Sequence, residues 1–332
     1  MQCSHYWRGH LMARPTLRQG SRGSDVVVLQ NALSIKPADG IFGLITEQAV
    51  KNFQADNGLV PDGIVGPVTW EALDELIGLP KPPPPSAGDL TAAEVQQITT
   101  LARQSAIQAY NWKGRGIMPP GYCKGMAIAY ACAFRKYNVD HAAFREIGKA
   151  NSKNDSKDVL SWYASTFNAA GMNNDDAGVS TLRHVYAFMM GLGMRESSGR
   201  HCEGRDMSAS NVSAITCEAG LFQTSWNAKA CSPTILQGLF NEYRGGKEGY
   251  QSIFKEGVYC SSNSWKNYGV GDGLQFQKMA KEQPLFAVEV AAVTMRNLRR
   301  HYGPINRRDV ELRKEANELL MQVQDLVAPV IA

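Results

Sequence analysis

One glutamate stands where a buried helix is expected to end. The segment 178–194 places apolar side chains on a wide face of a predicted helix, which stops at Arg195-Glu196-Ser197. A carboxyl at the end of such a helix can lie in an apolar pocket, where desolvation raises its pKa and keeps it protonated near neutral pH. Cleavage of a glycosidic bond needs an acid of this kind to protonate the leaving oxygen. Because Arg195 precedes Glu196, a surface ion pair is the competing interpretation.

A second motif follows Glu196 along the chain. Glu196-Ser197-Ser198-Gly199 precedes Glu218-Ala219-Gly220-Leu221-Phe222-Gln223-Thr224-Ser225. The two motifs together resemble the goose-type lysozyme and soluble lytic transglycosylase superfamily, in which a Glu-Ser pair precedes a Gly-Leu-Met-Gln-like stretch that lines the sugar cleft. The resemblance implies that Glu196 is the general acid, or acid/base, of glycan cleavage. It also implies a substrate-binding set: Ser197, Gly220, Leu221, Phe222, Gln223, Thr224 and Ser225.

The chain departs from that superfamily pattern at two positions. Phe222 replaces the commoner methionine, and Ser225 stands where some goose-type lysozymes carry an acidic residue. We take Asp206 as the candidate second catalytic carboxylate, with Glu203 as its alternative, and Glu218 as structural. Without an assured base, two reactions stay open. Attack by water gives hydrolysis, whereas intramolecular attack gives the 1,6-anhydro product of a lytic transglycosylase.

Two further parts of the sequence bear on the site. The segment 300–306 follows a helical pattern and is a candidate to bring Tyr302 to the cleft as a substrate contact, with a plain helix-ending turn as the alternative. In a rival interpretation, Cys123 opens a helix whose dipole favours a thiolate, and a histidine downstream acts as its base in a peptidase or amidase. The candidate bases are His184, His201 and His301. A wall-binding protein without activity is the third class.

Seven cysteines are present, and six of them lie beyond residue 120. Six cysteines allow 15 pairings, among which the sequence does not choose. Cys202 and Cys217 bracket the loop between the two motifs, and we expect a disulfide between them to brace the cleft, with partners elsewhere as the alternative. A disulfide of Cys123 with Cys132 or another cysteine is a further possibility. No zinc-type C-x-x-C spacing occurs and the six histidines are scattered, so we expect no metal and no cofactor.

A short repeat marks the N-terminal part. Asp39-Gly-Ile-Phe-Gly recurs as Asp62-Gly-Ile-Val-Gly, and each copy is followed by a threonine and an apolar helical pattern. With a further helix starting at Ser24, the pattern predicts a three-helix module. Residues 15–78 resemble the peptidoglycan-binding domain 1 family, which implies a module that docks on the bacterial wall without cutting it.

A proline-rich segment separates this module from the rest of the chain. Four consecutive prolines in residues 81–88 favour an extended spacer. We therefore divide the chain into an unassigned extension 1–14, a wall-binding domain 15–79, a linker 80–90 and a lysozyme-like domain 91–332. The fold class is all-α, mainly. Expected helices cover 91–112, 121–138, 156–170, 178–194, 284–302 and 306–327, and loops concentrate between 196 and 273.

Composition and charge limit the class of protein. The chain has 332 residues, 44% hydrophobic and 20% charged, with net charge +4, which is ordinary for a globular protein of about two domains. We expect no membrane span, no nucleic-acid partner and a monomer that binds bacterial peptidoglycan. The start at Met1, or at Met12, lacks the apolar core of a signal peptide. We therefore expect synthesis in the cytoplasm, action in the periplasm or on the wall, and an endolysin or an injected effector as the source.

Overall fold

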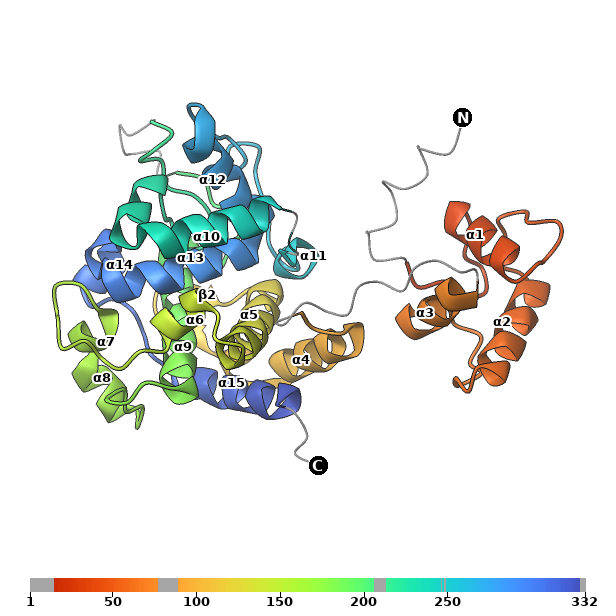
Figure 1. Ribbon diagram of the computed structural model, residues 1–332, viewed down its shortest axis with the longest axis horizontal. Helices are drawn as coiled ribbons and strands as arrows, with labels where there is room; N and C mark the ends of the chain where they lie inside the picture. Colours follow the sequence, from red (N-terminus) through yellow and green to blue (C-terminus); the bar gives the residue numbers. More distant parts are fainter. Residues whose placement is uncertain (1–14, 77–88, 206–212, 246, 248, 329–332) are drawn as a thin grey trace. The chain divides into compact units, whose positions relative to one another are not determined.

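The computed structural model describes residues 15–76, 89–205, 213–245, 247 and 249–328. The chain divides between residues 86 and 87 into two compact units, each with its own buried hydrophobic cluster (Figure 1). The described residues are mainly helical, which confirms the predicted fold class.

The described part of the first unit, residues 15–76, holds three helices. They are α1 (Ser24–Ala32), α2 (Leu44–Asp56) and α3 (Pro67–Leu76), as the sequence predicted. Buried apolar side chains from all three helices and from the loops between them form one cluster that includes Val26, Val50 and Trp70. The indole Nε1 of Trp70 donates a hydrogen bond to the carbonyl oxygen of Pro15 at 3.1 Å, which ties the start of the described module to α3.

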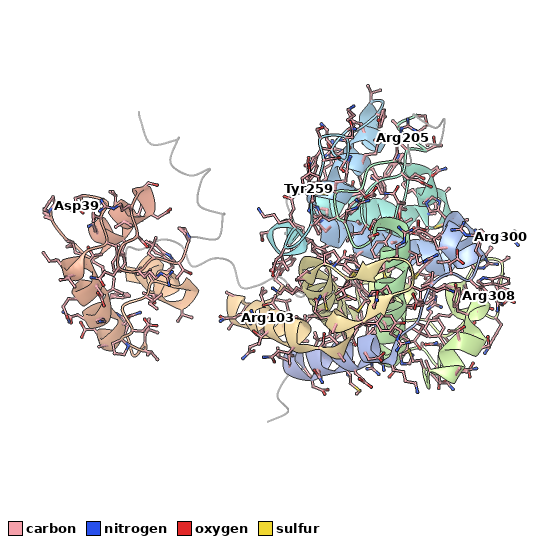
Figure 2. All side chains as sticks on the ribbon, turned by 180° about the vertical axis from the view of Figure 1, so that it is seen from behind. Asp39, Arg103, Arg205, Tyr259, Arg300 and Arg308 are labelled. Atoms are coloured by element: carbon pink, nitrogen blue, oxygen red, sulfur yellow. A yellow bond between two sulfur atoms is a disulfide. The ribbon has the colours of Figure 1, made fainter. Side chains whose placement is uncertain are left out.

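The repeat in this unit is held by two buried glutamines. Gln30 Nε2 donates to Asp39 Oδ1 at 2.8 Å, and Gln54 Nε2 donates to Asp62 Oδ1 at 2.9 Å. In both copies the N–H of the next glycine donates back to the glutamine Oε1 at 2.9 Å. Each Asp-Gly turn is therefore clamped by a helix, and Asp39 lies at the surface of the unit (Figure 2). The sequence pattern showed the turns, but not the glutamines that bind them.

The core of the second unit is built on three buried helices. They are α5 (Pro120–Asn138), α9 (Val179–Ser197) and α13 (Pro284–Asn297). Helices α4 (Ala92–Gln104) and α15 (Lys314–Val327) pack against α5, and α15 also contacts α9 (Figure 1). Every residue of α9 from 181 to 194 is buried, so this helix lies in the interior of the unit.

Short elements complete the second unit around these helices. β1 and β2 form an antiparallel hairpin in which Trp112 is opposite Gly116. The helices are η1 (Ala106–Ala109), α6 (Ala142–Ile147), α7 (Val159–Trp162), α8 (Ala164–Ala169), η2 (Trp226–Cys231), α10 (Pro233–Arg244), α11 (Gln251–Phe254), α12 (Gly271–Glu282), η3 (Arg299–His301) and α14 (Gly303–Asn306), and the strands are β1 (Asn111–Trp112) and β2 (Gly116–Ile117).

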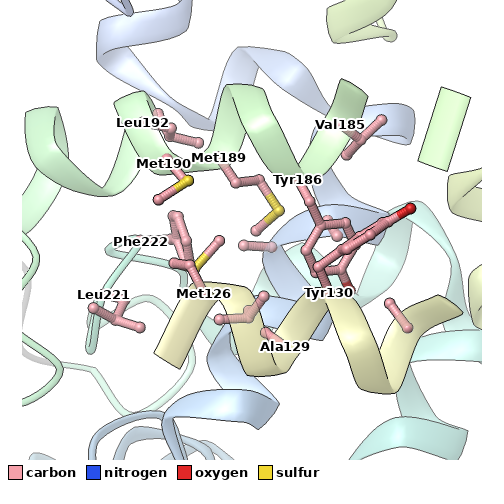
Figure 3. Close-up of a cluster of buried hydrophobic side chains, with 14 of the residues drawn as sticks. Met126, Ala129, Tyr130, Val185, Tyr186, Met189, Met190, Leu192, Leu221 and Phe222 are labelled. Atoms are coloured by element: carbon pink, nitrogen blue, oxygen red, sulfur yellow. The ribbon is translucent and has the colours of Figure 1, made fainter. Parts of the chain in front are cut away.

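Side chains from α5, α9 and a loop meet in the interior (Figure 3). Met126 of α5 and Met190 of α9 lie on either side of Phe222, which comes from the second motif. Tyr130 and Tyr186 pack with their ring centroids 5.7 Å apart. The motif at 218–225 is thus anchored in the same core that buries α9.

Several expected helices end or begin elsewhere. The helix expected at 91–112 ends at Gln104, where Ser105 adopts an extended backbone. The helix expected at 284–302 ends at Asn297 and is followed by a short 3-10 turn. The expected helix at 156–170 is broken at Tyr163 into α7 and α8.

The helix expected at 306–327 is wrong over its first turns. Arg308 has a φ of 58°, and the N–H of Val310 donates to the hydroxyl of Tyr163 at 3.3 Å. The Glu311 carboxylate accepts hydrogen bonds from Tyr110 Oη at 2.8 Å and from the N–H of Lys113 at 2.9 Å. Tertiary contacts therefore replace helical ones until α15 begins.

The region between 196 and 273 holds more helix than expected. α10 begins with Pro233 and buries Leu236, Leu239, Phe240 and Tyr243 along one face. Pro at the first helical position and this apolar spacing are ordinary helix signals. The glycine, asparagine and serine residues around this segment favour loops and obscure these helix signals in the sequence.

Candidate active site

Glu196 lies in the last turn of α9, which ends at Ser197, three residues beyond the end expected at residue 194. The helix ends because Ser198 and Gly199 adopt left-handed backbone conformations, with φ of 55° and 75°. The Gly199 N–H donates to the carbonyl of Gly193 at 3.1 Å, which closes the helix end. A Cβ at position 199 would lie 2.9 Å from the Tyr122 ring, so only glycine fits there. The main chain that carries Glu196 is thus fixed on both sides.

Burial and a neighbouring carboxylate raise the pKa of Glu196 to about 8. Desolvation is the larger cause, and the negative charge of Glu218 adds to it. The positive charges of Arg307 and Arg115 partly offset both effects. Glu196 is therefore mostly protonated at neutral pH, which is the state that a general acid needs. The sequence pointed to Glu196 but interpreted Glu218 as structural.

Arg195 does not form the competing ion pair with Glu196 and has other partners instead. Its guanidinium faces Asp309 at 3.8 Å and donates to the carbonyl of Lys113 at 3.0 Å. From the turn of the β1–β2 hairpin, Arg115 donates to the carbonyl of Arg195 at 2.5 Å. The hairpin therefore holds the end of α9. No sequence signal connects a residue at 115 with this helix end.

The second motif forms a tight turn. The N–H of Ala219 donates to the carbonyl of Thr224 at 3.1 Å, and Gly220 and Gln223 have φ of 76° and 47°. The Gln223 side chain folds back, and its Nε2 donates to the Gly220 carbonyl at 3.1 Å. A Cβ on Gly220 would lie 2.4 Å from the carbonyl oxygen of Ala280. The glycine is thus needed for close packing against α12.

Leu221 and Phe222, which were expected to bind substrate, point into the hydrophobic core. Both side chains are fully buried, within the hydrophobic cluster shown in Figure 3. A side chain in the core does not form a sugar-binding surface. These two residues instead anchor the turn to the hydrophobic cluster. Ser197 and Ser225 are also buried, and their hydroxyls bond to Gly193 O at 3.1 Å and Asn227 Oδ1 at 2.6 Å.

Tyr302 is brought to the second motif. Its hydroxyl lies 3.2 Å from Thr224 Oγ1, and both side chains are buried. Burial raises the pKa of Tyr302 well above its usual range, and the charge of Glu196 contributes in the same direction. Tyr302 therefore lies beside Thr224, where the charge of Glu196 acts on its hydroxyl. Glu203 pairs with Arg200 at 2.5 Å, and burial raises its pKa; Asp206 lies outside the described residues.

The expected disulfide between Cys202 and Cys217 is wrong. Cys202 is bonded to Cys260, 58 residues further along the chain, with a Cα–Cα distance of 6.0 Å. With His201, these two cysteines are the metal-type cluster found among the described residues, and its two sulfurs are bonded to each other. The disulfide ties the turn after α9 to the segment that follows α11.

The cysteine-nucleophile interpretation fails on the environment of Cys123. The thiol is buried beneath α4, and burial raises its pKa to about 12 instead of favouring a thiolate. His184 lies in α9 with Nδ1 2.8 Å from Asn174 Oδ1, and burial lowers its pKa to about 4. Cys132 is also buried with a pKa raised to about 12, and Cys123 is not bonded to it.

Comparison with known proteins identifies the first unit. Residues 22–73 match the family model described as "Putative peptidoglycan binding domain". The chain is 44% identical over 72 residues, 20% of its length, to an "Uncharacterized protein in bpoA1 3'region" of Kitasatospora aureofaciens. It is 40% identical over 63 residues, 18% of its length, to a spore cortex-lytic enzyme of Halalkalibacterium halodurans. These matches span 61% and 19% of the two relatives.

A solved structure also resembles the chain at low similarity. The crystal structure of a Burkholderia AP3 phage endolysin matches with 16% identity, covering 94% of this chain and 99% of that one, at a TM-score of 0.20. The family match is specific, and residues 22–73 belong to the peptidoglycan-binding domain family, as the sequence predicted. Within the described residues, no helix has the length and apolar character to cross a bilayer.

Proposed function

We propose that the second unit is a peptidoglycan-cleaving muramidase. It cuts the β-1,4 bond between N-acetylmuramic acid and N-acetylglucosamine, with Glu196 as the general acid. The observation that carries this proposal is the pKa of about 8 at Glu196, because a carboxyl that stays protonated at neutral pH can protonate a glycosidic oxygen. The peptidoglycan-binding domain in the same chain supports a wall glycan as the substrate.

In the proposed reaction, Glu196 donates its proton to the leaving oxygen as the glycosidic bond breaks. Positive charge then develops on the muramic acid ring in an oxocarbenium-like transition state. Glu218, whose charge acts on Glu196, supplies a negative charge near this position. Water adds to the sugar in the hydrolytic reaction. In the transglycosylase alternative, the sugar's own 6-hydroxyl adds instead and gives a 1,6-anhydro product.

The first unit would hold the enzyme on its polymer. A tethered binding module raises the local concentration of substrate around the second unit without any new contact at the active site. The likeness to a spore cortex-lytic enzyme agrees with action on a bacterial wall. We propose that the protein works as a single chain, as an endolysin that lyses a host cell from the periplasmic side.

Mass spectrometry of digested peptidoglycan tests this proposal. Purified sacculi are incubated with the wild-type chain and with Glu196→Gln, which keeps the shape of the side chain but cannot donate an acidic proton. Products that end in reducing N-acetylmuramic acid, absent with the variant, support the muramidase. Ends in 1,6-anhydro-muramic acid keep the role of Glu196 and change the reaction to transglycosylation. Cleaved peptides on intact glycan, or unchanged activity in the variant, overturn the proposal.

A further inference from the structure

A hollow lies beside the turn that follows Glu196. It is a cavity of about 660 Å³ lined by His201, Gln251, Ser252, Lys255, Glu256 and Trp265, among others. This volume lies within the range of roughly 300–1,000 Å³ that is typical of small-molecule sites. The cavity contains an aromatic ring, amide and hydroxyl groups and charged groups. It therefore offers an apolar face together with hydrogen-bonding partners.

The aromatic wall of this cavity is held firmly. Lys281 is buried, and its Nζ donates to the carbonyls of Ser264 at 2.9 Å and Lys266 at 2.8 Å, on either side of Trp265. The ring of His201 meets that of Trp265 at a centroid distance of 5.9 Å. His201 itself is fixed because its Nδ1 lies 2.9 Å from the Lys281 carbonyl oxygen. A ligand would meet an indole ring whose position is already set, which lowers the cost of binding.

The two charged residues of the cavity differ in their pairing. Glu256 is neutralised by Lys124, whose Nζ lies 2.7 Å from both carboxylate oxygens. Lys255 is exposed and makes no salt bridge with the described residues. The cavity thus presents one cation without a local counter-charge. A carboxylate on a ligand would complement it.

Chain connectivity places this cavity close to Glu196. His201 follows Glu196 by five residues, so their Cα atoms are separated by at most about 18 Å. The Cys202–Cys260 disulfide joins the same turn to a residue of the cavity wall. The separation between the two places is therefore within the length of a short glycan strand.

We propose that this cavity binds a peptide-bearing muramoyl unit of the glycan strand, with the sugar ring against Trp265 and a stem-peptide carboxylate at Lys255. This inference rests on the proposed function, because it assigns a further part of the substrate to the same unit. A pyranose has a face of C–H groups that packs on an indole, and its hydroxyl and acetamido groups match Gln251 and Ser252. The stem peptide supplies the carboxylate, which a chitin chain lacks.

Calorimetric titration of the full chain tests the cavity separately from catalysis. All proteins carry Glu196→Gln, so that no turnover occurs. The probes are a disaccharide-tetrapeptide muropeptide and chitotetraose. We expect Trp265→Ala to weaken the cavity's binding of both probes about tenfold, as for a central aromatic contact. We expect Lys255→Gln to weaken binding of the muropeptide alone, about threefold, as for an exposed ion pair.

Matched controls lie next to the cavity. Tyr259 is an exposed aromatic residue adjacent to Cys260 (Figure 2), and Lys266 is an exposed lysine adjacent to Trp265; neither lines the cavity. Tyr259→Ala and Lys266→Gln are expected to bind as the parent does, and Trp265→Phe is expected to recover part of the loss. If Trp265→Ala binds both probes like Tyr259→Ala, the inference is overturned. If binding depends on the cavity but the wild type releases no glycan product, only the proposed reaction fails.

Discussion

Glu218 raises the pKa of Glu196 through its negative charge, on top of the effect of burial. The two carboxyl groups belong to the two separate motifs, one at the end of α9 and one just before the tight turn at 219–224. A carboxyl whose pKa is raised beside a second carboxyl group is a common way to keep a general acid protonated.

We expect Glu218→Gln to shift the alkaline limb of the pH–activity profile to lower pH. The substitution removes a charge that disfavours ionisation of Glu196, so the acid loses its proton earlier as the pH rises. The measurement is the initial rate of sacculus clearing between pH 5 and pH 9. Glu318→Gln is the matched control, because Glu318 is an exposed carboxylate of α15 that belongs to neither motif. An unchanged limb in Glu218→Gln would contradict the electrostatic coupling.

Glu196→Gln is expected to be more stable than the wild type at alkaline pH. The pKa of Glu196 rises from 4.5 to about 8 on folding, so the folded state binds more protons than the unfolded state between these values. Wild-type stability therefore falls as the pH rises through this window, by up to about 5 kcal/mol from this group. Glutamine does not ionise and escapes the loss. Thermal unfolding at pH 5 and pH 8 measures the difference, and a constant gap between the two proteins would count against a raised pKa at Glu196.

Gly193→Ala should disturb the helix end that carries Glu196. A Cβ at this position would lie 2.2 Å from Tyr122 Oη, which donates to the Met189 carbonyl at 2.9 Å. We expect a loss of about 2 kcal/mol in the free energy of unfolding from overpacking, together with lower activity. Gly238 in α10 is the control, because nothing lies within 4 Å of its Cβ position. Gly238→Ala should gain up to about 1 kcal/mol from helix propensity, and equal effects at both sites would refute the steric argument.

Gln54→Ala should destabilise the peptidoglycan-binding unit. The change removes the bonds to Asp62 and Gly63 and leaves buried polar groups without a partner. The expected loss in the free energy of unfolding is about 3 kcal/mol. Gln48→Ala is the control, since Gln48 is exposed and bonds only to exposed Asn52 in the described residues. Retention on sacculi, measured in the Glu196→Gln background, should fall for Gln54→Ala alone. Equal retention of both variants would show that the clamp is dispensable.

Reduction should loosen the turn after α9. The Cys202–Cys260 bond closes a loop with a sequence separation of 58, which corresponds to about 4 kcal/mol of chain-entropy stabilisation. We expect Cys202→Ser with Cys260→Ser to lower the midpoint of thermal unfolding, and dithiothreitol to lower that of the wild type but not of the double variant. Cys231→Ser is the control for loss of a thiol outside this bond. A reductant effect of equal size in all three proteins would argue against this origin.

The sequence was sufficient for the parts whose signals are local. The helix at 178–194 was predicted because its apolar residues recur over a long segment, and Glu196 was singled out because it stands at the end of that segment. The repeat predicted the three helices of the first unit because an Asp-Gly turn specifies its own backbone. Residues 22–73 then matched the expected family.

Other parts depend on contacts between distant segments. Arg115 reaches Arg195 from a hairpin 80 residues earlier in the chain, and Cys202 bonds to Cys260 instead of the nearer Cys217. Neither contact leaves a pattern in the residues around it. Leu221 and Phe222 show a related limit, because a motif that places them beside a site does not say which way their side chains point. Their burial follows from packing against α5 and α9.

The helix α9 is both the interior support of the second unit and the mount of Glu196. Its 19 residues therefore experience two kinds of selection at once. A substitution that changes the packing around Met189 or Met190 also moves the Glu196 carboxyl at the end of the same helix. A substitution that changes the orientation of this carboxyl in turn strains the interior packing. Directed evolution for thermal stability and for catalytic rate would thus act on the same positions of α9. Substitutions in the loops and in the first unit are expected to change one property with less effect on the other.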